Sequence, residues 1–239
     1  MVKHHYVRLP MAHAYNIRDL GGYPCPGGHC TRWGTLLRAD NLSRLDAAEI
    51  AFLKDYGLTC DIDLRSPQEC GLQPDALQNA EGVEYRNIPL IPLAVTNEVG
   101  AFEGLKDMGS MYISVMESAH EQIMEVMRAV IHAPGGVLFH CSAGKDRTGV
   151  IAMLLLGLAG VSRGDIIGNY ETSYTYIRQN PDFKKYDNAQ THNTFLSKHQ
   201  YIEAVLDHID ETYGGIPEFL LGIGMTEAEL EALRNKIVE

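Results

Sequence analysis

Basic residues are scarce in this chain. Its 239 residues include 20 Lys and Arg against 31 Asp and Glu, which gives a formal net charge of −11. Nucleic-acid backbones and anionic membrane surfaces are bound by clustered lysine and arginine. The composition therefore predicts no nucleic-acid partner and no general attraction to membranes. Any anionic ligand must be drawn by cations close to its binding site.

Long hydrophobic runs are also missing. The longest apolar stretch covers residues 150–161, which is too short to span a bilayer. The first residues lack the apolar segment of a secretory signal peptide. We therefore expect no integral membrane segment and a cytoplasmic location, while secretion without a visible signal stays open.

Cysteine is sparse and odd in number. Five cysteines in a chain of this size do not make a disulfide scaffold, and they fit a reducing compartment. Cys25, His29 and Cys30 lie close together, but the prolines and glycines of residues 24–28 predict a turn between hairpin flanks. No second pair of ligands follows at the spacing of a zinc site. We predict neither a metal nor a cofactor.

The overall composition is typical of one globular domain. Hydrophobic residues make up 45% of the chain and charged residues 21%, which is enough for a sizeable core. No linker, repeat or low-complexity segment divides the sequence, so we expect a single domain over residues 1–239. Residues 179–199 are the most polar stretch and predict an insertion loop or a surface segment.

One stretch contains most of the chemistry. Residues 137–149 read Val-Leu-Phe-His-Cys-Ser-Ala-Gly-Lys-Asp-Arg-Thr-Gly, with an apolar strand-like segment before Cys141 and an apolar helix-like segment, 150–158, afterwards. A loop that ends at a helix N-terminus presents backbone N–H groups to an anion and favours the thiolate form of a cysteine. The planar fork of Arg147 grips two oxygens of a phosphoryl group. The loop thus combines a nucleophile, an anion cradle and a clamp.

The pair Gly144-Lys145 does not indicate a nucleotide-binding loop of the Walker A type. That motif requires another glycine five residues before Gly144 and a Ser or Thr after the lysine. This chain has Phe139 and Asp146 at those positions. Gly144 instead allows the backbone to wrap closely around a ligand.

The pattern His-Cys-x5-Arg-Thr of residues 140–148 resembles the signature of cysteine-dependent protein tyrosine phosphatases. Other stretches resemble blocks of a bacterial and fungal branch of that superfamily, namely residues 16–23, 38–43, 61–66, 213–215 and 225–230. The similarity therefore covers essentially the whole chain. The resemblance implies an α/β protein tyrosine phosphatase fold. It also implies hydrolysis of phosphotyrosine, with phosphoserine, phosphothreonine or phosphoinositides as further substrates. The expected partner is a phosphorylated protein or a phosphoinositide.

Each residue of the loop has an expected role. The Cys141 thiolate attacks phosphorus and forms a thiophosphate, which water then cleaves. The side chain of Arg147 and the backbone N–H groups hold the equatorial oxygens, where charge gathers in the transition state. The expected phosphate-binding residues are Ser142, Ala143, Gly144, Lys145, Asp146, Arg147 and Thr148.

Residues around the loop are expected to support it. Thr148 is placed to donate a hydrogen bond to the Cys141 sulfur and make it a better leaving group. His140 is expected to orient the loop. Asp63 and Arg65 follow a buried strand, and we expect them to form an ion pair that supports the loop.

The general acid is harder to place. Most relatives supply it from an aspartate after the strand that corresponds here to residues 83–88, and residues 89–97 contain none. We expect Asp146 to take this role, because a carboxyl group beside a bound anion tends to keep its proton. The alternative is a carboxylate that only shapes the loop. Weaker candidates are Asp107, Glu98 and Glu103.

Other functions stay open at this point. The absence of an aspartate from residues 89–97 also fits a phosphate-binding module with little catalytic activity. Turnover of a simple aryl phosphate would distinguish an enzyme from such a module. A sulfur- or arsenate-transforming enzyme uses a similar anion loop, but thiol-redox chemistry requires a resolving cysteine, and the nearest in sequence is Cys70. Lys145 is either a second cation for the extra phosphates of an inositol or a solvent-facing lysine.

Hydrophobic periodicity and capping signals predict alternating strands and helices. Strands are expected at 31–38, 58–64, 83–88 and 137–139, and helices after Pro67, after Thr226 and at 44–56, 107–132, 150–158, 162–178 and 195–213. Ser43 is expected to cap the first of the long helices and Gly57 to end it. The alternation predicts a mainly parallel sheet flanked by helices. A ligand is expected at the carboxyl ends of the strands, where Cys141 lies.

Overall fold

A five-stranded sheet forms the centre of the molecule. The computed structural model describes residues 4–90, 107–183 and 195–239. The strands lie in the order β1 (Arg18–Asp19), β2 (Leu36–Ala39), β5 (Gly136–His140), β3 (Leu58–Asp63) and β4 (Glu84–Asn87). Neighbouring strands are parallel except for β1 and β2. The prediction of a mainly parallel sheet is confirmed.

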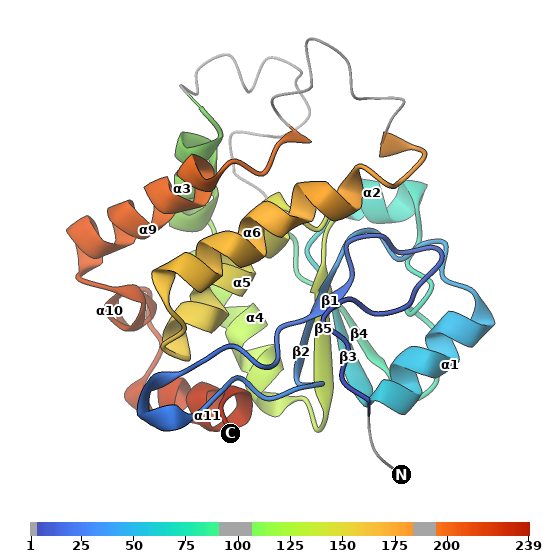
Figure 1. Ribbon diagram of the computed structural model, residues 1–239, viewed down its shortest axis with the longest axis horizontal. Coiled ribbons are helices and arrows are strands. Elements are labelled where there is room, and N and C mark those ends of the chain that lie inside the picture. The colour runs from blue at the N-terminus through green and yellow to red at the C-terminus, as the bar shows by residue number, and fades with distance from the viewer. Residues whose placement is uncertain (1–3, 91–106, 184–194) are drawn as a thin grey trace.

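Helices cover both faces of this sheet (Figure 1). One face carries α1 (Ala47–Tyr56), and the short helix α2 (Pro67–Leu72) follows β3. The other face is covered by helices from the second half of the chain: α3 (Met108–Ser118), α4 (His120–His132), α5 (Asp146–Leu158), α6 (Arg163–Ile177), α9 (His199–Tyr213), α10 (Ile216–Gly222) and α11 (Glu227–Ile237).

Strand side chains alternate between two hydrophobic cores. Val137 and Phe139 of β5 belong to the larger core with α5, while Leu138 belongs to the smaller core with α1. This is the two-residue period of a strand that is covered on both faces. Helix α5 packs between the sheet and the helices α3, α6 and α10. Residues 150–156 are therefore all buried, which explains their uniformly apolar sequence.

The capping residue of α1 differs from the prediction. Asp46, not Ser43, caps this helix: its carboxylate accepts a hydrogen bond from the Glu49 N–H at 2.9 Å, and the Glu49 carboxylate accepts one from the Asp46 N–H at 3.1 Å. Ser43 lies earlier in a turn, where its N–H donates to the Asn41 side chain at 2.9 Å. Gly57 ends the helix with a φ of 109°, as predicted.

The single helix predicted over residues 107–132 is two helices, α3 and α4. They meet at Ala119, whose backbone is not helical. The Ser118 hydroxyl donates to the carbonyls of Ser114 (2.7 Å) and Val115 (3.3 Å), where it competes with the N–H groups that would continue α3. A hydrophobic pattern does not reveal such an interruption.

Other boundaries also differ. The helix predicted at 195–213 begins at His199, and the strand predicted at 31–38 covers only β2. The short elements β1 and α10 were not predicted, because neither is long enough to show a hydrophobic period. The turn between Cys25 and Cys30 is confirmed: Pro24 and Cys30 pair as antiparallel neighbours across it.

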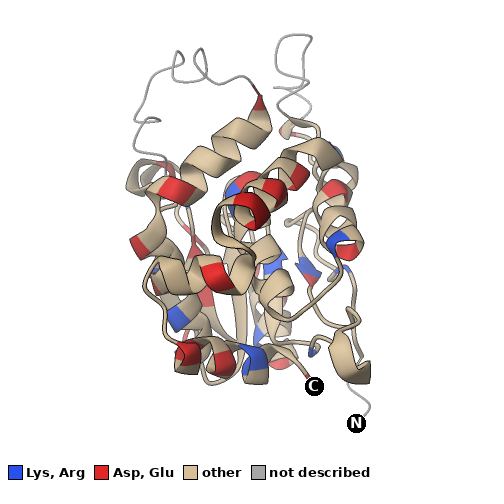
Figure 2. Ribbon diagram, turned by 90° about the vertical axis from the view of Figure 1, so that its left-hand side faces the viewer, with Lys and Arg blue, Asp and Glu red and all other residues tan. Residues whose placement is uncertain are grey.

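Charged residues are spread over several helices and do not gather on one of them. Figure 2 shows Asp and Glu positions on several helices of one side, with fewer Lys and Arg positions among them. None of the helices in the described ranges is long and apolar enough to cross a membrane.

The two candidate caps of α1 make a matched pair of substitutions. Asp46→Ala removes the acceptor of the Glu49 N–H, so we expect the free energy of unfolding to fall by about 1 kcal/mol. Ser43→Ala removes no cap, and we expect a change within about 0.5 kcal/mol. Urea unfolding of both variants measures the difference. A larger loss in Ser43→Ala would mean that the helix begins earlier than the structure shows.

Candidate active site

The loop between β5 and α5 lies at the carboxyl edge of the sheet. His140 ends β5 and Asp146 begins α5, so Cys141 stands directly beyond the central strand. Gly144 has a φ of +64°, and a Cβ there would lie 2.3 Å from the Ala39 carbonyl oxygen. Only glycine fits this position, because both the backbone conformation and the space exclude a side chain.

Side chains from distant segments hold the outer side of the loop. Asn16 donates to the carbonyls of Ala143 (3.0 Å) and Gly144 (2.9 Å), and Arg38 donates to the Gly144 carbonyl at 2.8 Å. The Asn41 N–H donates to the Ser142 carbonyl at 3.2 Å. Carbonyl oxygens that are bound on the outside do not face an anion on the inside. This is the arrangement that an anion-binding loop requires.

Arg147 forms a two-pronged ion pair with Glu69 of α2. Both guanidinium nitrogens lie 2.8 Å from the Glu69 carboxylate oxygens. Ser142 donates its hydroxyl to the same carboxylate at 2.5 Å. Burial opposes ionisation of Glu69, yet the Arg147 and Ser142 donors hold its pKa well below its ordinary value. The guanidinium of Arg147 is therefore held in one orientation by Glu69.

Sequence reasoning missed Glu69. In the sequence it reads as the third helical residue of a capping box with Ser66, and it does make that box. Its second contact crosses from α2 to Arg147, 78 positions further along the chain. Only the folded chain reveals this contact.

Asp146 lies at the start of α5 and is partly exposed, with a relative side-chain exposure of 27%. Its Oδ1 accepts a hydrogen bond from the Tyr112 hydroxyl and lies 3.2 Å from the Lys145 Nζ. Tyr112 of α3 also contacts the Tyr170 hydroxyl at 2.7 Å. Burial and the nearby Asp146 carboxylate raise the pKa of Tyr112, so this tyrosine stays a donor. The two tyrosines were not predicted as site residues.

Lys145 is buried, so the solvent-facing alternative is wrong. Its relative exposure is 2%, and its Nζ lies between the Asp146 carboxylate and the Leu196 carbonyl, 3.4 Å away. The lysine therefore joins the loop to the segment that precedes α9.

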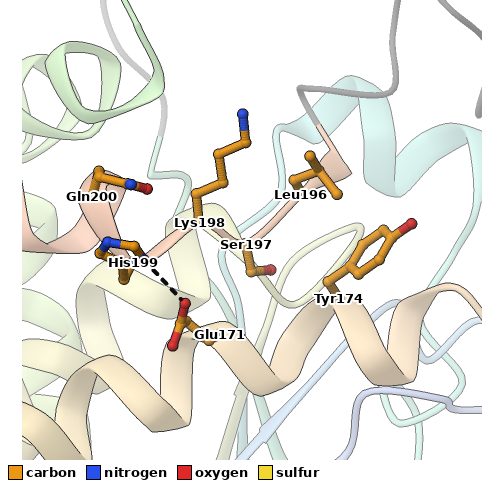
Figure 3. Close-up of a pocket in the computed structure, with 7 residues that line it drawn as sticks. All are labelled: Glu171, Tyr174, Leu196, Ser197, Lys198, His199 and Gln200. Carbon is orange, nitrogen blue, oxygen red and sulfur yellow. Dashed lines mark ion pairs between the residues drawn. The ribbon is translucent and has the colours of Figure 1, made fainter.

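Leu196 forms part of a hollow at the start of α9 (Figure 3). The hollow has a volume of about 340 Å³ and is lined by Glu171, Tyr174 and residues 196–200. His199 pairs with Glu171 across it at 3.4 Å. None of the described residues that line it belongs to the loop 141–147, so it is not the candidate active site.

Asp63 and Arg65 form the expected ion pair, and both are buried. The Arg65 guanidinium contacts the Asp63 carboxylate at 2.9 Å and 2.7 Å and donates to the Gln73 carbonyl at 2.9 Å. Burial alone would raise the pKa of Asp63, but the hydrogen bonds from Arg65 lower it to about 2.

His140 lies inside a buried acidic cluster formed by Asp61, Asp63 and Asp75. Its Nε2 is 3.2 Å from Asp75 and 3.7 Å from each of the other two carboxylates. Burial would lower the pKa of His140, but these carboxylates raise it to about 9. The imidazole is thus a cation directly before Cys141. Burial raises the pKa of Asp61 well above its ordinary value, although the charge of His140 opposes this rise.

Two groups in the described ranges have metal-ligand residue types within reach of one another. The first is His13, Asp46 and Glu49, where Glu49 already accepts the N–H groups of Ala12 (2.6 Å) and His13 (3.0 Å). The second is Asp61, Asp75 and His140. A protonated His140 and the neighbouring Arg65 supply the positive charge there, so we assign no metal to either group.

Of the three weaker acid candidates, the described residues include Asp107 alone. Asp107 caps α3, where its carboxylate accepts the Ser110 N–H at 2.9 Å. Glu98 and Glu103 lie outside the described residues. Cys70, the nearest cysteine in sequence to Cys141, contacts Asp63 at 3.3 Å, and all five cysteines are free thiols.

Similar sequences define the class of the protein. The model of the tyrosine phosphatase family matches residues 9–239. The "Tyrosine-protein phosphatase" of Nostoc commune is 32% identical over 217 residues, which are 84% of this chain and 73% of that protein. The "Triple specificity protein phosphatase PtpB" of Mycobacterium tuberculosis is 24% identical and covers 94% of this chain and 97% of its own length.

The chain therefore belongs to the tyrosine phosphatase family. It is a protein tyrosine phosphatase, an enzyme that hydrolyses the phosphate ester of phosphotyrosine.

The buried cluster around His140 makes stability depend on pH. The pKa of His140 is about 9 in the folded protein and 6.5 for an unperturbed histidine, so the folded state binds this proton more tightly. Its contribution of about 3 kcal/mol is complete below pH 6.5 and is lost as the pH rises through about 9. We expect urea unfolding to show this decline in the wild type. His140→Gln should lack it, and equal slopes in both proteins would contradict a charged His140.

Proposed function

We propose that Cys141 is the nucleophile of this phosphatase and carries the phosphoryl group as a thiophosphate. The observation that supports this most strongly is the position of Cys141, at the end of β5, inside a loop whose carbonyls are bound on the outside. The backbone N–H groups of residues 142–147 then receive the equatorial oxygens. Arg147, already oriented by Glu69, clamps two of them in the transition state.

Thr148 fits the second chemical step. Its side chain is buried, and its hydroxyl has no hydrogen-bond partner among the described residues. A buried donor without a partner is costly. Donation to the Cys141 sulfur would satisfy it and stabilise the thiolate that leaves when water attacks the thiophosphate.

Asp146 is our candidate for the general acid. Tyr112 and Lys145 both contact its Oδ1, which fixes the carboxyl group at the rim of the loop. No described residue forms a hydrogen bond with Oδ2, so this oxygen is the one that can carry the proton. In this role the proton on Oδ2 passes to the leaving phenolate oxygen.

The cavity beside the loop supports an aromatic phosphomonoester as substrate. It has a volume of about 240 Å³ and is lined by Ser142 and Ala143, by polar residues such as Asn41 and Gln73, and by the larger apolar or aromatic side chains of Tyr15, Ile177, Phe183 and Phe195. Arg44 lines it too, but this cation is paired with Asp182. Lys145 and Arg147 are likewise paired with carboxylates.

These pairings favour phosphotyrosine in proteins over phosphoinositides, because a polyphosphorylated headgroup requires additional cations. The similar Mycobacterium tuberculosis protein is called a triple specificity phosphatase. We propose that phosphoserine and phosphothreonine are slower substrates of this chain. Inositol phosphates, in the same proposal, are the poorest.

The organisation of the whole chain follows the same proposal. The larger core includes residues from Leu20 to Ile237, and Thr31 pairs with Val238 as an antiparallel bridge. We propose that residues 1–239 act as one phosphatase domain. A cytoplasmic location stays a prediction that rests on the free cysteines and the sequence.

A substrate panel with a nucleophile variant tests the function. We expect purified protein to hydrolyse a phosphotyrosine peptide faster than phosphoserine, phosphothreonine and phosphoinositide substrates. Cys141→Ser should abolish turnover yet still bind inorganic phosphate, because its backbone cradle is unchanged. Substantial turnover by Cys141→Ser would show that another residue is the nucleophile. A preference for phosphoinositides would overturn the substrate assignment.

The acid role of Asp146 is tested through the leaving group. Asp146→Asn should slow hydrolysis of a phosphotyrosine peptide by about 100-fold or more. An activated aryl phosphate, whose phenolate leaves without a proton, should be spared. Rates with both substrates across pH measure the contrast. Equal losses would make Asp146 a residue that only shapes the loop, and would direct attention to Asp107, Glu98 and Glu103.

A further inference from the structure

We propose that Arg38 is a positioning residue that places a fixed positive charge behind the loop, where it stabilises both the Cys141 thiolate and the bound phosphoryl group. Arg38 touches neither of them. The proposal rests on Cys141 being the nucleophile, as argued above. The chain is acidic, and Arg38 is a cation of the anion site that pairs with no carboxylate of the described residues.

Arg38 is completely buried, with a relative exposure of 0%, on the strand next to β5. One guanidinium nitrogen donates to the Gly144 carbonyl at 2.8 Å, and another donates to the Asn169 side-chain oxygen at 2.6 Å. Both acceptors are neutral. No carboxylate of the described residues lies within ion-pair distance of Arg38.

A buried cation without a counter-ion is costly, so it needs an anion elsewhere. Burial lowers the pKa of Arg38 to about 10, which still leaves it charged at neutral pH. Among the groups that oppose this decrease, Cys141 acts most strongly, ahead of Tyr23, Tyr170 and Asp146. In this proposal a thiolate at Cys141, and then a bound phosphoryl dianion, supplies the anion that this charge needs.

A second buried arginine lies directly beside the first. Arg18 of β1 is in register with Arg38 and is also fully buried. Burial, followed by the charge of Arg38, lowers the pKa of Arg18 well below its ordinary value. Two cations in this position raise the positive potential behind the loop further.

Asn169 of α6 connects both arginines. Its backbone carbonyl accepts from Arg18 at 2.7 Å, while its side-chain oxygen accepts from Arg38. Its amide donates to the Tyr23 hydroxyl at 2.9 Å. An aspartate here would make an equally good acceptor and would give Arg38 a counter-ion. A neutral amide keeps the hydrogen bond and leaves the charge of Arg38 directed at the loop.

Asn169→Asp is the variant that separates charge from structure. It keeps the shape and the acceptor oxygen, and the Tyr23 hydroxyl can donate to the new carboxylate. We expect the pH midpoint for alkylation of Cys141 by iodoacetamide, followed by mass spectrometry, to rise by about one pH unit. We also expect inorganic phosphate to bind about tenfold more weakly, measured in the Cys141→Ser background. Thermal stability should be kept, because a buried cation gains a partner.

Gln179→Glu is the matched control. Gln179 is an exposed amide just beyond α6 that accepts a hydrogen bond from Arg8 at 3.2 Å, so its substitution adds the same charge away from the loop. We expect no shift in the alkylation midpoint. An unchanged midpoint and unchanged phosphate binding in Asn169→Asp would overturn the proposal and leave Arg38 a purely structural donor.

Substitution of Arg38 itself adds a second test. Arg38→Lys keeps the charge, so its alkylation midpoint should stay close to that of the wild type, whereas Arg38→Gln should raise it. Similar midpoints in the two variants would contradict an electrostatic role. A failure of the proposed function can be told apart from a failure of the Arg38 proposal. If Cys141 is not the nucleophile, Cys141→Ser turns over substrate whatever residues occupy positions 38 and 169.

Discussion

The loop that contains Cys141 is held from every side by the ends of the sheet, and the other features of the site depend on this. Asn16 lies before β1, Ala39 ends β2 and Asn41 follows it, and the segment after β3 leads to Glu69. Each contact binds the outer side of the loop or the guanidinium of Arg147. A flexible loop would lose conformational entropy when it binds phosphate. A loop that is fixed in this way has already lost that entropy during folding, so binding does not have to oppose it.

The distribution of charge follows from the same arrangement. The chain has a net charge of −11, so it repels phosphate at long range. Its site compensates with cations that are oriented by carboxylates, as in the pair of Arg147 with Glu69, and with two arginines that are buried behind the loop. Attraction is therefore confined to the place where the transition state gathers charge.

The features that depend on contiguous residues were predictable from the sequence. Residues 137–149 predict a strand, an anion-binding loop and a helix because all of the residues involved are neighbours in the chain. The parallel sheet is predicted by the alternation of strands and helices around them. Glu69, Tyr112 and Arg38 could not be found this way, because their contacts with the loop join segments that only folding brings together. The helix start at Asp46 was missed for a different reason: both Ser43 and Asp46 are good capping residues, and tertiary packing selects between them.

The central claim is that phosphate passes through Cys141. Rapid acid quenching of the wild-type enzyme during turnover of a phosphotyrosine peptide, followed by mass spectrometry of its proteolytic fragments, tests this directly. We predict a phosphate on the fragment that contains Cys141, at a level that falls when Asp146→Asn slows transfer of the phosphoryl group from the peptide to Cys141. A phosphate on any other residue would contradict the account. So would the absence of phosphate from every fragment of enzyme that is quenched during turnover.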